Sequence, residues 1–159
     1  MFTCDERSRG VREALKEYPE IQTVEASFVG FYEVKQIAER LLFENPDLKG
    51  MWVVWDTPAF EAMKGIRGMN PSLVVSTIDL SYDTAKEILH GNLLIGTGTQ
   101  HPYHQGVAEA LMTGVALSGK TPPPFIVIPG ELVTRENMRE VWQNVFLQPI
   151  PEKMLSEAP

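Results

Sequence analysis

The sequence predicts an α/β fold, a doubly wound parallel sheet flanked by helices on both faces. Apolar residues recur at spacings of three and four along several segments, which is the period of a helix with one buried face. Between these segments lie short runs that are almost continuously apolar or threonine, as expected for strands buried on both sides. Helix and strand alternate along the chain, and this alternation favours a parallel sheet with helical crossovers.

The first half of the chain begins with a helix, and each predicted strand follows a helix. Thr57-Pro58 marks one helix start, because threonine caps helix ends and proline fits the first turn. In chain order the elements are a helix at 11–18, a strand at 21–26, a helix at 34–41, a strand at 51–55, a helix at 59–63 and a strand at 73–78.

The second half continues the alternation. Ser81 is expected to cap its first helix, and Pro102 to occupy the first turn of the next. Prolines at 122–124 end that helix and force an extended entry into the following strand. The elements are a helix at 85–89, a strand at 93–99, a helix at 102–118, a strand at 125–128 and a helix at 138–145. Residues 148–159 are proline-rich and polar, so they predict a loose tail after one domain over 1–147.

The composition excludes several classes of partner. Among the 159 residues, 14 Lys and Arg stand against 21 Asp and Glu, for a net charge of −7. Such an acidic chain lacks the positive charge that displaces phosphate counterions, so we expect no nucleic acid. No apolar run approaches the roughly 20 residues that cross a bilayer, and no signal-peptide pattern opens the sequence, so we expect no direct membrane insertion. A single cysteine, Cys4, excludes an internal disulfide.

Polar and aromatic residues gather where the predicted strands end. Ligands of open parallel sheets bind beyond the carboxyl ends of the strands. Carboxylates and amides pair with hydroxyl groups, and aromatic planes cover the C–H face of a sugar, so the set suits a polyhydroxylated ligand. The candidate ligand-binding residues are Arg7, Phe28, Phe31, Trp55, Asp56, Asp79 and Gln100.

Each of these residues also has a purely structural explanation. Asp56 and Asp79 could cap the helices that follow them. Trp55 could belong to the core, and Arg7 could be a solvated residue at a helix start. Only the convergence of the whole set at one edge favours a binding site.

Signals for catalysis are weak. His101 and His104 have metal-like spacing, but no third ligand is evident nearby. Gly96-x-Gly98 follows a strand, yet the dinucleotide fingerprint fails because His101 stands at its last glycine position. No nucleophile with an attendant base occurs in the set. We therefore expect no catalytic residues, no metal and no cofactor.

An ordered series of short motifs runs through nearly the whole chain, from about Arg7 to Trp142. It includes Arg7-x-x-Gly10-Val11, Asn45-Pro46-Asp47-Leu48-Lys49-Gly50, Trp55-Asp56-x-x-Ala59, Asp79, His90-Gly91, Gln100-x-Pro102-x-x-x-Gly106, Leu117-x-Gly119-Lys120 and Leu132-Val133-Thr134-x-Glu136-Asn137. In this order the series resembles the C-terminal lobe of a type I periplasmic sugar-binding protein, the ribose-binding-protein-like group of ABC transporters.

The resemblance implies that Arg7 and Asp79 bind sugar hydroxyls and that Gln100 lies where the chain passes toward the other lobe. It also implies a stacking aromatic at Phe28 or Phe31. Trp55-Asp56 departs from the usual Asn-Asp of this group, which puts a large ring where a polar contact is expected. The ligand is then a sugar or polyol, although the tryptophan leaves its identity open.

The resemblance further implies a solute-binding component whose lobes close on the ligand and which ABC permease subunits recognise, in the periplasm or outside the cell at the membrane. The N-terminal lobe is missing from this sequence, and segments within 102–147 normally return to it. The apolar faces of the helix at 102–118 and the strand at 125–129 should then be exposed, so we expect self-association through 102–129. Two alternatives are the effector domain of a LacI-like regulator and a small hydrolase or metal enzyme using His101, His104 and Asp79.

Overall fold

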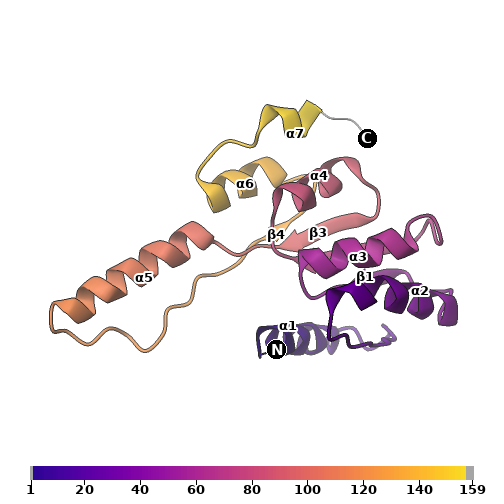
Figure 1. The fold of residues 1–159 in the computed structure, drawn as a ribbon, viewed down its shortest axis with the longest axis horizontal. Coiled ribbons are helices and arrows are strands. Elements are labelled where there is room, and N and C mark those ends of the chain that lie inside the picture. The colour runs from indigo at the N-terminus through magenta and orange to yellow at the C-terminus, as the bar shows by residue number, and fades with distance from the viewer. Residues whose placement is uncertain (1, 157–159) are drawn as a thin grey trace. The chain divides into compact units, whose positions relative to one another are not determined.

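The computed structural model describes residues 2–156 of the chain. They divide into two compact units, the first ending at Ile78 and the second beginning at Asp79, and helices and strands alternate through both (Figure 1). The α/β fold class predicted from the sequence is therefore confirmed.

The first unit packs two helices beside a pair of parallel strands. Its elements are α1 (Phe2–Leu15), the 3-10 helix η1 (Phe31–Glu33), α2 (Val34–Glu44), β1 (Gly50–Trp52), α3 (Asp56–Ile66) and β2 (Val74–Ile78). β1 and β2 run parallel, as predicted, and Gly50 lies opposite Val74. The core is apolar and comes from α2, α3 and β2, with Ala38, Leu42, Ala59, Ala62, Met63, Ile66 and Val75 all buried. Helix α1 contributes no buried residue to it.

The second unit surrounds a short antiparallel pair of strands. Its elements are α4 (Tyr82–His90), β3 (Leu94–Gly98), α5 (Pro102–Leu117), β4 (Leu132–Val133), α6 (Met138–Phe146) and α7 (Glu152–Ser156). Ser81 caps α4 by accepting a hydrogen bond from the backbone N–H of Thr84 at 3.2 Å, as predicted. The core residues are Ala85, Ile88, Leu94, Val133, Met138, Val141, Val145 and Met154.

The structure corrects several sequence-based boundaries. Residues 21–26 and 125–128 form no strand, because β-rich sequence yields a strand only where a neighbouring strand pairs with it. Val24 and Phe125 are instead exposed. The last strand is β4, and it lies antiparallel to β3 with Val133 opposite Thr97. Trp55, not Thr57, is the N-cap residue of α3.

The described part of the predicted tail is more ordered than its composition suggests. Residues 148–159 are predicted to form a loose tail, of which 157–159 lie outside the described residues, but α7 lies within 148–156 and Met154 is fully buried. The backbone carbonyl of Met154 also lies 2.6 Å from Nε2 of His90, at the end of α4. One buried apolar side chain and one polar contact thus hold α7 against α4.

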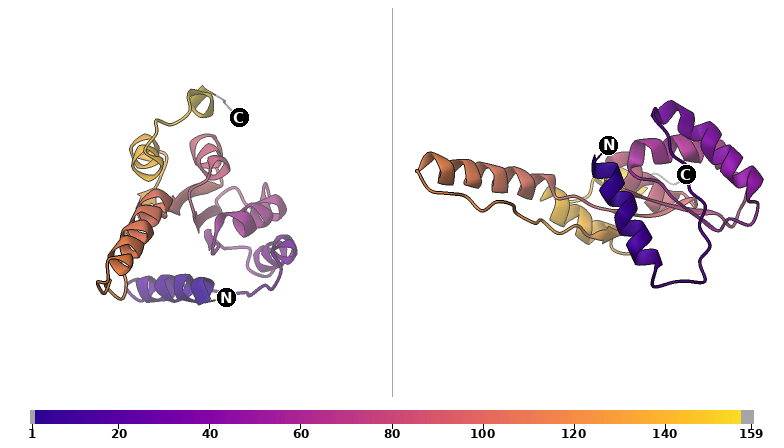
Figure 2. Two further views of the ribbon diagram at one scale, coloured as in Figure 1. Left: turned by 60° about the vertical axis from the view of Figure 1, so that its left-hand side comes forward. Right: turned by 90° about the horizontal axis from the view of Figure 1, so that it is seen from below.

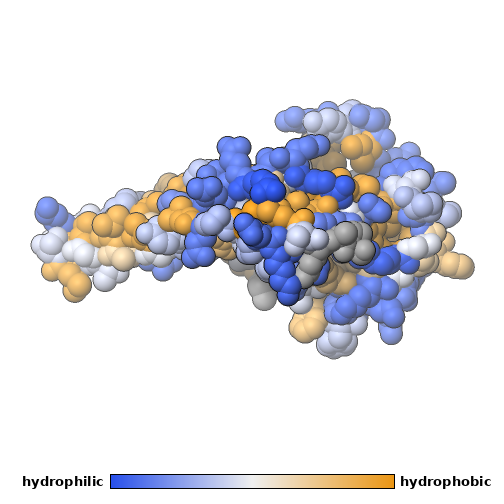
Figure 3. Space-filling model, turned by 90° about the horizontal axis from the view of Figure 1, so that it is seen from above, coloured by the Kyte–Doolittle hydropathy of each residue, from blue (hydrophilic) through white to orange (hydrophobic). Residues whose placement is uncertain are grey.

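A long projection distinguishes the second unit. Helix α5 extends away from α4 and α6, and the segment after it runs back alongside the helix (Figures 1 and 2). We call residues 102–130 the arm. No residue of α5 is buried, and exposed apolar side chains gather along the arm (Figure 3). They include Tyr103, Val107, Leu111, Leu117, Phe125, Ile126 and Val127. The exposure expected for these segments is therefore confirmed.

Candidate functional site

In the second unit, Asp79 and Gln100 lie together beside the end of β3. The Gln100 side-chain amide donates a hydrogen bond to Oδ1 of Asp79. The backbone of Asp79 is held as well, since its N–H donates to the Gly98 carbonyl at 2.8 Å and its carbonyl accepts from the Thr97 hydroxyl at 3.2 Å. The structure thus joins two residues that lie 21 positions apart in the sequence.

The backbone of Asp79 adopts an uncommon conformation. Its φ is 82°, in the left-handed region that residues other than glycine seldom occupy. Asp tolerates this region better than most residues, but it still costs on the order of 1–3 kcal/mol and is found mainly at functional sites. The strain and the hydrogen bonds together fix where the carboxylate points.

A shallow hollow opens beside this pair. It has a volume of about 280 Å³ and is lined by Asp79, Leu80, Gln100, Pro102 and Gln105. The carboxylate accepts hydrogen bonds, the two amides both donate and accept, and Leu80 and Pro102 supply apolar surface. This lining suits a ligand with alternating hydroxyl and C–H groups better than it suits a wholly apolar ligand.

In the first unit, two aromatic rings lie together beside the end of β1. Trp55 stands at the N-terminus of α3, and its ring centroid lies 5.7 Å from that of Phe28 at an interplanar angle of 49°. Both rings are half-buried. Phe31 begins η1 and is exposed. Of the two aromatic candidates, Phe28 is therefore the one placed against Trp55.

Arg7 and Asp56 lie close to Trp55 along the chain or in space. Arg7 is on α1, and its guanidinium Nη1 donates to the carbonyl of Val54 at 3.0 Å. Asp56 lies in the first turn of α3, where Oδ1 accepts from the backbone N–H of Thr57 at 2.7 Å. The first unit therefore gathers a cation and two rings around residues 54–55.

An exposed ion pair ties α1 to the segment that leads to Phe28. Arg12 of α1 donates from Nε and Nη2 to the two carboxylate oxygens of Glu25, at 2.9 and 2.7 Å. The hydrogen bond from Arg12 lowers the pKa of Glu25, and its positive charge adds to the effect. The two hydrogen bonds from Arg12 help to position α1, the helix that carries Arg7.

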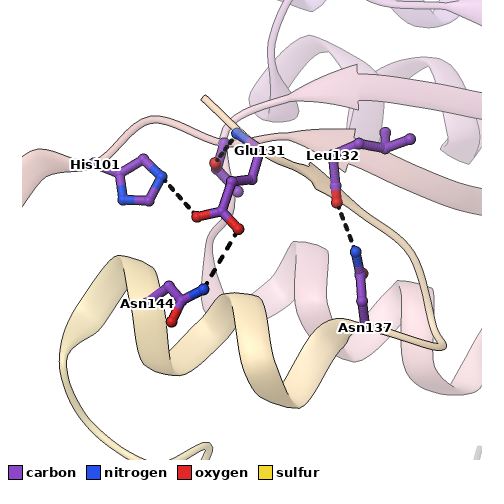
Figure 4. A network of polar contacts seen from close by, with 6 residues as sticks. His101, Glu131, Leu132, Asn137 and Asn144 are labelled. Atoms are coloured by element: carbon purple, nitrogen blue, oxygen red, sulfur yellow. Dashed lines mark hydrogen bonds and ion pairs between the residues drawn. The ribbon is translucent and has the colours of Figure 1, made fainter. Parts of the chain in front are cut away.

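Sequence reasoning missed Glu131, which belongs to a polar network at the base of the arm (Figure 4). Its Oε1 lies 3.1 Å from Nε2 of His101, and its Oε2 accepts from the Asn144 amide at 3.5 Å. Its backbone N–H donates to the Thr99 hydroxyl at 2.9 Å, and its carbonyl accepts from the Thr99 N–H at 2.8 Å. No periodicity links residues this far apart, so only the folded chain shows the network.

The two histidines show no sign of a metal centre. His101 is buried and contacts Glu131, while the ring of His104 meets that of His101 edge-on with centroids 5.5 Å apart. Among residues 2–156, no group of three or more His, Cys, Asp or Glu side chains is arranged to hold a metal ion. Over the same residues, no helix is both long and apolar enough to cross a bilayer.

Known structures resemble this chain, although no protein-family model and no curated protein matches it. An ABC transporter solute-binding protein from Agrobacterium vitis, bound with α-D-tagatopyranose, superposes with a TM-score of 0.80 at 18% identity. A 5-methylthioribose transporter solute-binding protein from Thermotoga lettingae gives 0.75 at 16% identity. A second Agrobacterium vitis solute-binding protein, with bound allitol, gives 0.71 at 19% identity.

The coverage of these matches is unequal. The alignments span 93%, 96% and 83% of this chain but only 50%, 50% and 49% of the three neighbours. The chain therefore has the fold of about half of a sugar solute-binding protein, which is consistent with one lobe. The neighbours are transport proteins, so the comparisons do not favour the regulator or the enzyme alternative.

Proposed function

We propose that this chain is a solute-binding part of an ABC-type transporter and that it binds a sugar or polyol without chemical change. The observation that carries the proposal is the Asp79–Gln100 pair, which stands in a hollow lined by polar and apolar groups. Structural neighbours with bound tagatose, allitol and 5-methylthioribose support the ligand class.

The proposed ligand contacts are assigned within each unit separately. Asp79 accepts hydrogen bonds from ligand hydroxyls, and Gln100 both donates and accepts them. Arg7 donates to hydroxyl oxygens, and the rings of Phe28 and Trp55 cover the C–H face of the ligand. Asp56 and Phe31 are secondary candidates, because Asp56 is already bonded to Thr57 and Phe31 stands apart on η1.

The proposed partners and compartment follow from the neighbours. Transporter proteins of this kind work with permease subunits, so we propose that such subunits recognise the ligand-bound form, in the periplasm or outside the cell at the membrane. We propose that this lobe closes on the ligand together with a second lobe, because only the closed form makes the contacts of both lobes.

We also propose that the arm associates with the arm of a second copy of this chain. The row of exposed apolar side chains on α5 and on residues 125–127 supports this proposal. Such surface is unfavourable in water at about 25 cal/mol per Å², so covering it stabilises an assembly. The arm has only two charged residues before Glu131, Glu109 and Lys120, and their opposite signs leave little repulsion between two arms.

The binding proposal is tested by calorimetry and thermal shift with D-tagatose, allitol and 5-methylthioribose. A ligand that binds only the native state raises its melting temperature, so at least one of them should stabilise the chain. Asp79→Asn should weaken that binding, because it removes the charged acceptor and leaves the size unchanged. Asp83→Asn on α4 is the matched control, since Asp83 is exposed and is not in the hollow. Equal affinities of the two variants would refute the site.

A further inference from the structure

Glu131 contacts both residues that flank Gln100. On one side it exchanges two hydrogen bonds with Thr99, through its backbone N–H and its carbonyl. On the other side its carboxylate lies 3.1 Å from Nε2 of His101 (Figure 4). The residue proposed to touch the ligand therefore stands between two residues held by the same glutamate.

Neighbouring residues restrict the Glu131–His101 contact. The His101 side chain is only 9% exposed, whereas the Glu131 side chain is 37% exposed, so the imidazole side of the contact is shielded from water more than the carboxylate side. The amide of Asn144 reaches the second oxygen of Glu131 from α6. The chain also approaches closely here, because a Cβ at Gly130 would lie only 2.5 Å from the Thr99 carbonyl.

We propose that Glu131 and His101 are positioning residues that hold Gln100 ready to bind the ligand with Asp79. The inference rests on the proposed function, in which Gln100 and Asp79 contact a sugar or polyol. A backbone fixed on both sides of Gln100 leaves its side chain less freedom to lose on binding, and such preorganisation increases affinity. The amide is also kept within reach of the Asp79 carboxylate before any ligand arrives.

The same contacts would also be made if Glu131 and His101 acted only as a brace, that is, as a pair that stabilises the base of the arm. The two roles differ in what they do to Gln100. A brace affects only the free energy of unfolding, whereas a positioning pair also affects how the Gln100 side-chain amide is held and how tightly the folded protein binds the ligand.

The test compares Glu131→Ala, His101→Ala and the conservative Glu131→Gln, which keeps an acceptor facing His101. The control is His90→Ala, which removes another polar contact of this unit, with the Met154 carbonyl, and should also lower stability. In ligand-free protein, the side-chain amide signal of Gln100 is followed by ¹H–¹⁵N NMR and identified by its loss in Gln100→Ala. The affinity for D-tagatose is then measured by calorimetry.

We expect both alanine variants to move the Gln100 amide signal and to weaken binding roughly tenfold, the effect typical of outer-shell partners. Glu131→Gln and His90→Ala should leave the signal near its wild-type position. An unmoved signal in Glu131→Ala, or an equal movement in His90→Ala, would overturn the proposal. If His101→Ala does not fold, the comparison of Glu131→Ala with Glu131→Gln decides. If the wild type binds none of the three sugars, the proposed function fails for these ligands, and the NMR result then decides only whether Glu131 and His101 hold the Gln100 amide in place.

Discussion

The Oε1 atom of Glu131 lies 3.1 Å from Nε2 of His101, and this contact joins the chain entering the arm to the chain leaving it. The intervening 102–130 segment therefore begins and ends at one polar network, which also includes Thr99 and Asn144. Asp79 and Gln100 stand next to that network. The base of the arm and the proposed ligand contacts are thus neighbours in the fold.

The arm should control self-association. Phe125→Glu places a charge on the exposed apolar row, so we expect the variant to remain monomeric at concentrations where the wild type forms dimers or larger species. Phe43→Glu is the matched control, because Phe43 on α2 is 82% exposed and Phe125 is 75% exposed. Light scattering coupled to size exclusion gives the mass. A wild-type chain that stays monomeric at high micromolar concentration would refute the proposed interface.

Arg7 should matter for binding more than for stability. Its guanidinium donates to the partly buried carbonyl of Val54, while α1 itself contributes no buried residue to the core. Arg7→Ala should therefore weaken the binding of a responsive sugar by about 1.5–3 kcal/mol, the range for hydrogen bonds to charged groups. Arg9→Ala serves as the control, since Arg9 forms an ion pair with the exposed Glu6. If calorimetry shows the same affinity for both variants, Arg7 is not a ligand contact.

Gly130 should tolerate no side chain. A Cβ there would lie 2.5 Å from the Thr99 carbonyl, so Gly130→Ala must shift backbone and should destabilise the chain by about 1–3 kcal/mol. Gly106→Ala offers the contrast, because the added Cβ meets nothing within 4 Å and alanine favours a helix by roughly 0.5–1 kcal/mol. The midpoints of urea unfolding of the two variants should shift in opposite directions from that of the wild type. If Gly130→Ala left the free energy of unfolding unchanged, the backbone at Gly130 would be free to shift away from Thr99.

The Arg12–Glu25 pair should contribute stability that depends on pH. Arg12 lowers the pKa of Glu25 in the folded chain, so the stabilisation is present above the ordinary pKa of a glutamate. It is lost as the pH falls through the lowered value, because the carboxylate is then protonated. Arg12→Gln should raise the Glu25 pKa in an NMR titration and lower stability only at the higher pH values. Lys16→Gln, which removes the partner of Glu13, should leave the Glu25 titration unchanged.

Local sequence signals worked where a residue's role depends on its near neighbours. Ser81 caps α4 because its hydroxyl reaches the N–H of Thr84, only three positions away. The same local reasoning failed at 125–128, since a β-rich run becomes a strand only beside a strand that pairs with it. It failed again at the chain end, where one apolar residue, Met154, anchors a helix in a polar segment.

For the candidate site, the sequence by itself determined which chemical groups stand after the strands, including the carboxylate of Asp79 and the amide of Gln100. Only the tertiary structure decided that these two groups bond to each other, that Phe28 lies against Trp55 and that Glu131 reaches His101. The physical reason is that residue type and periodicity report forces between neighbours in the chain. Contacts across 20 or 30 residues are set by how elements pack, and periodicity shows which face of an element is buried but not which element covers it.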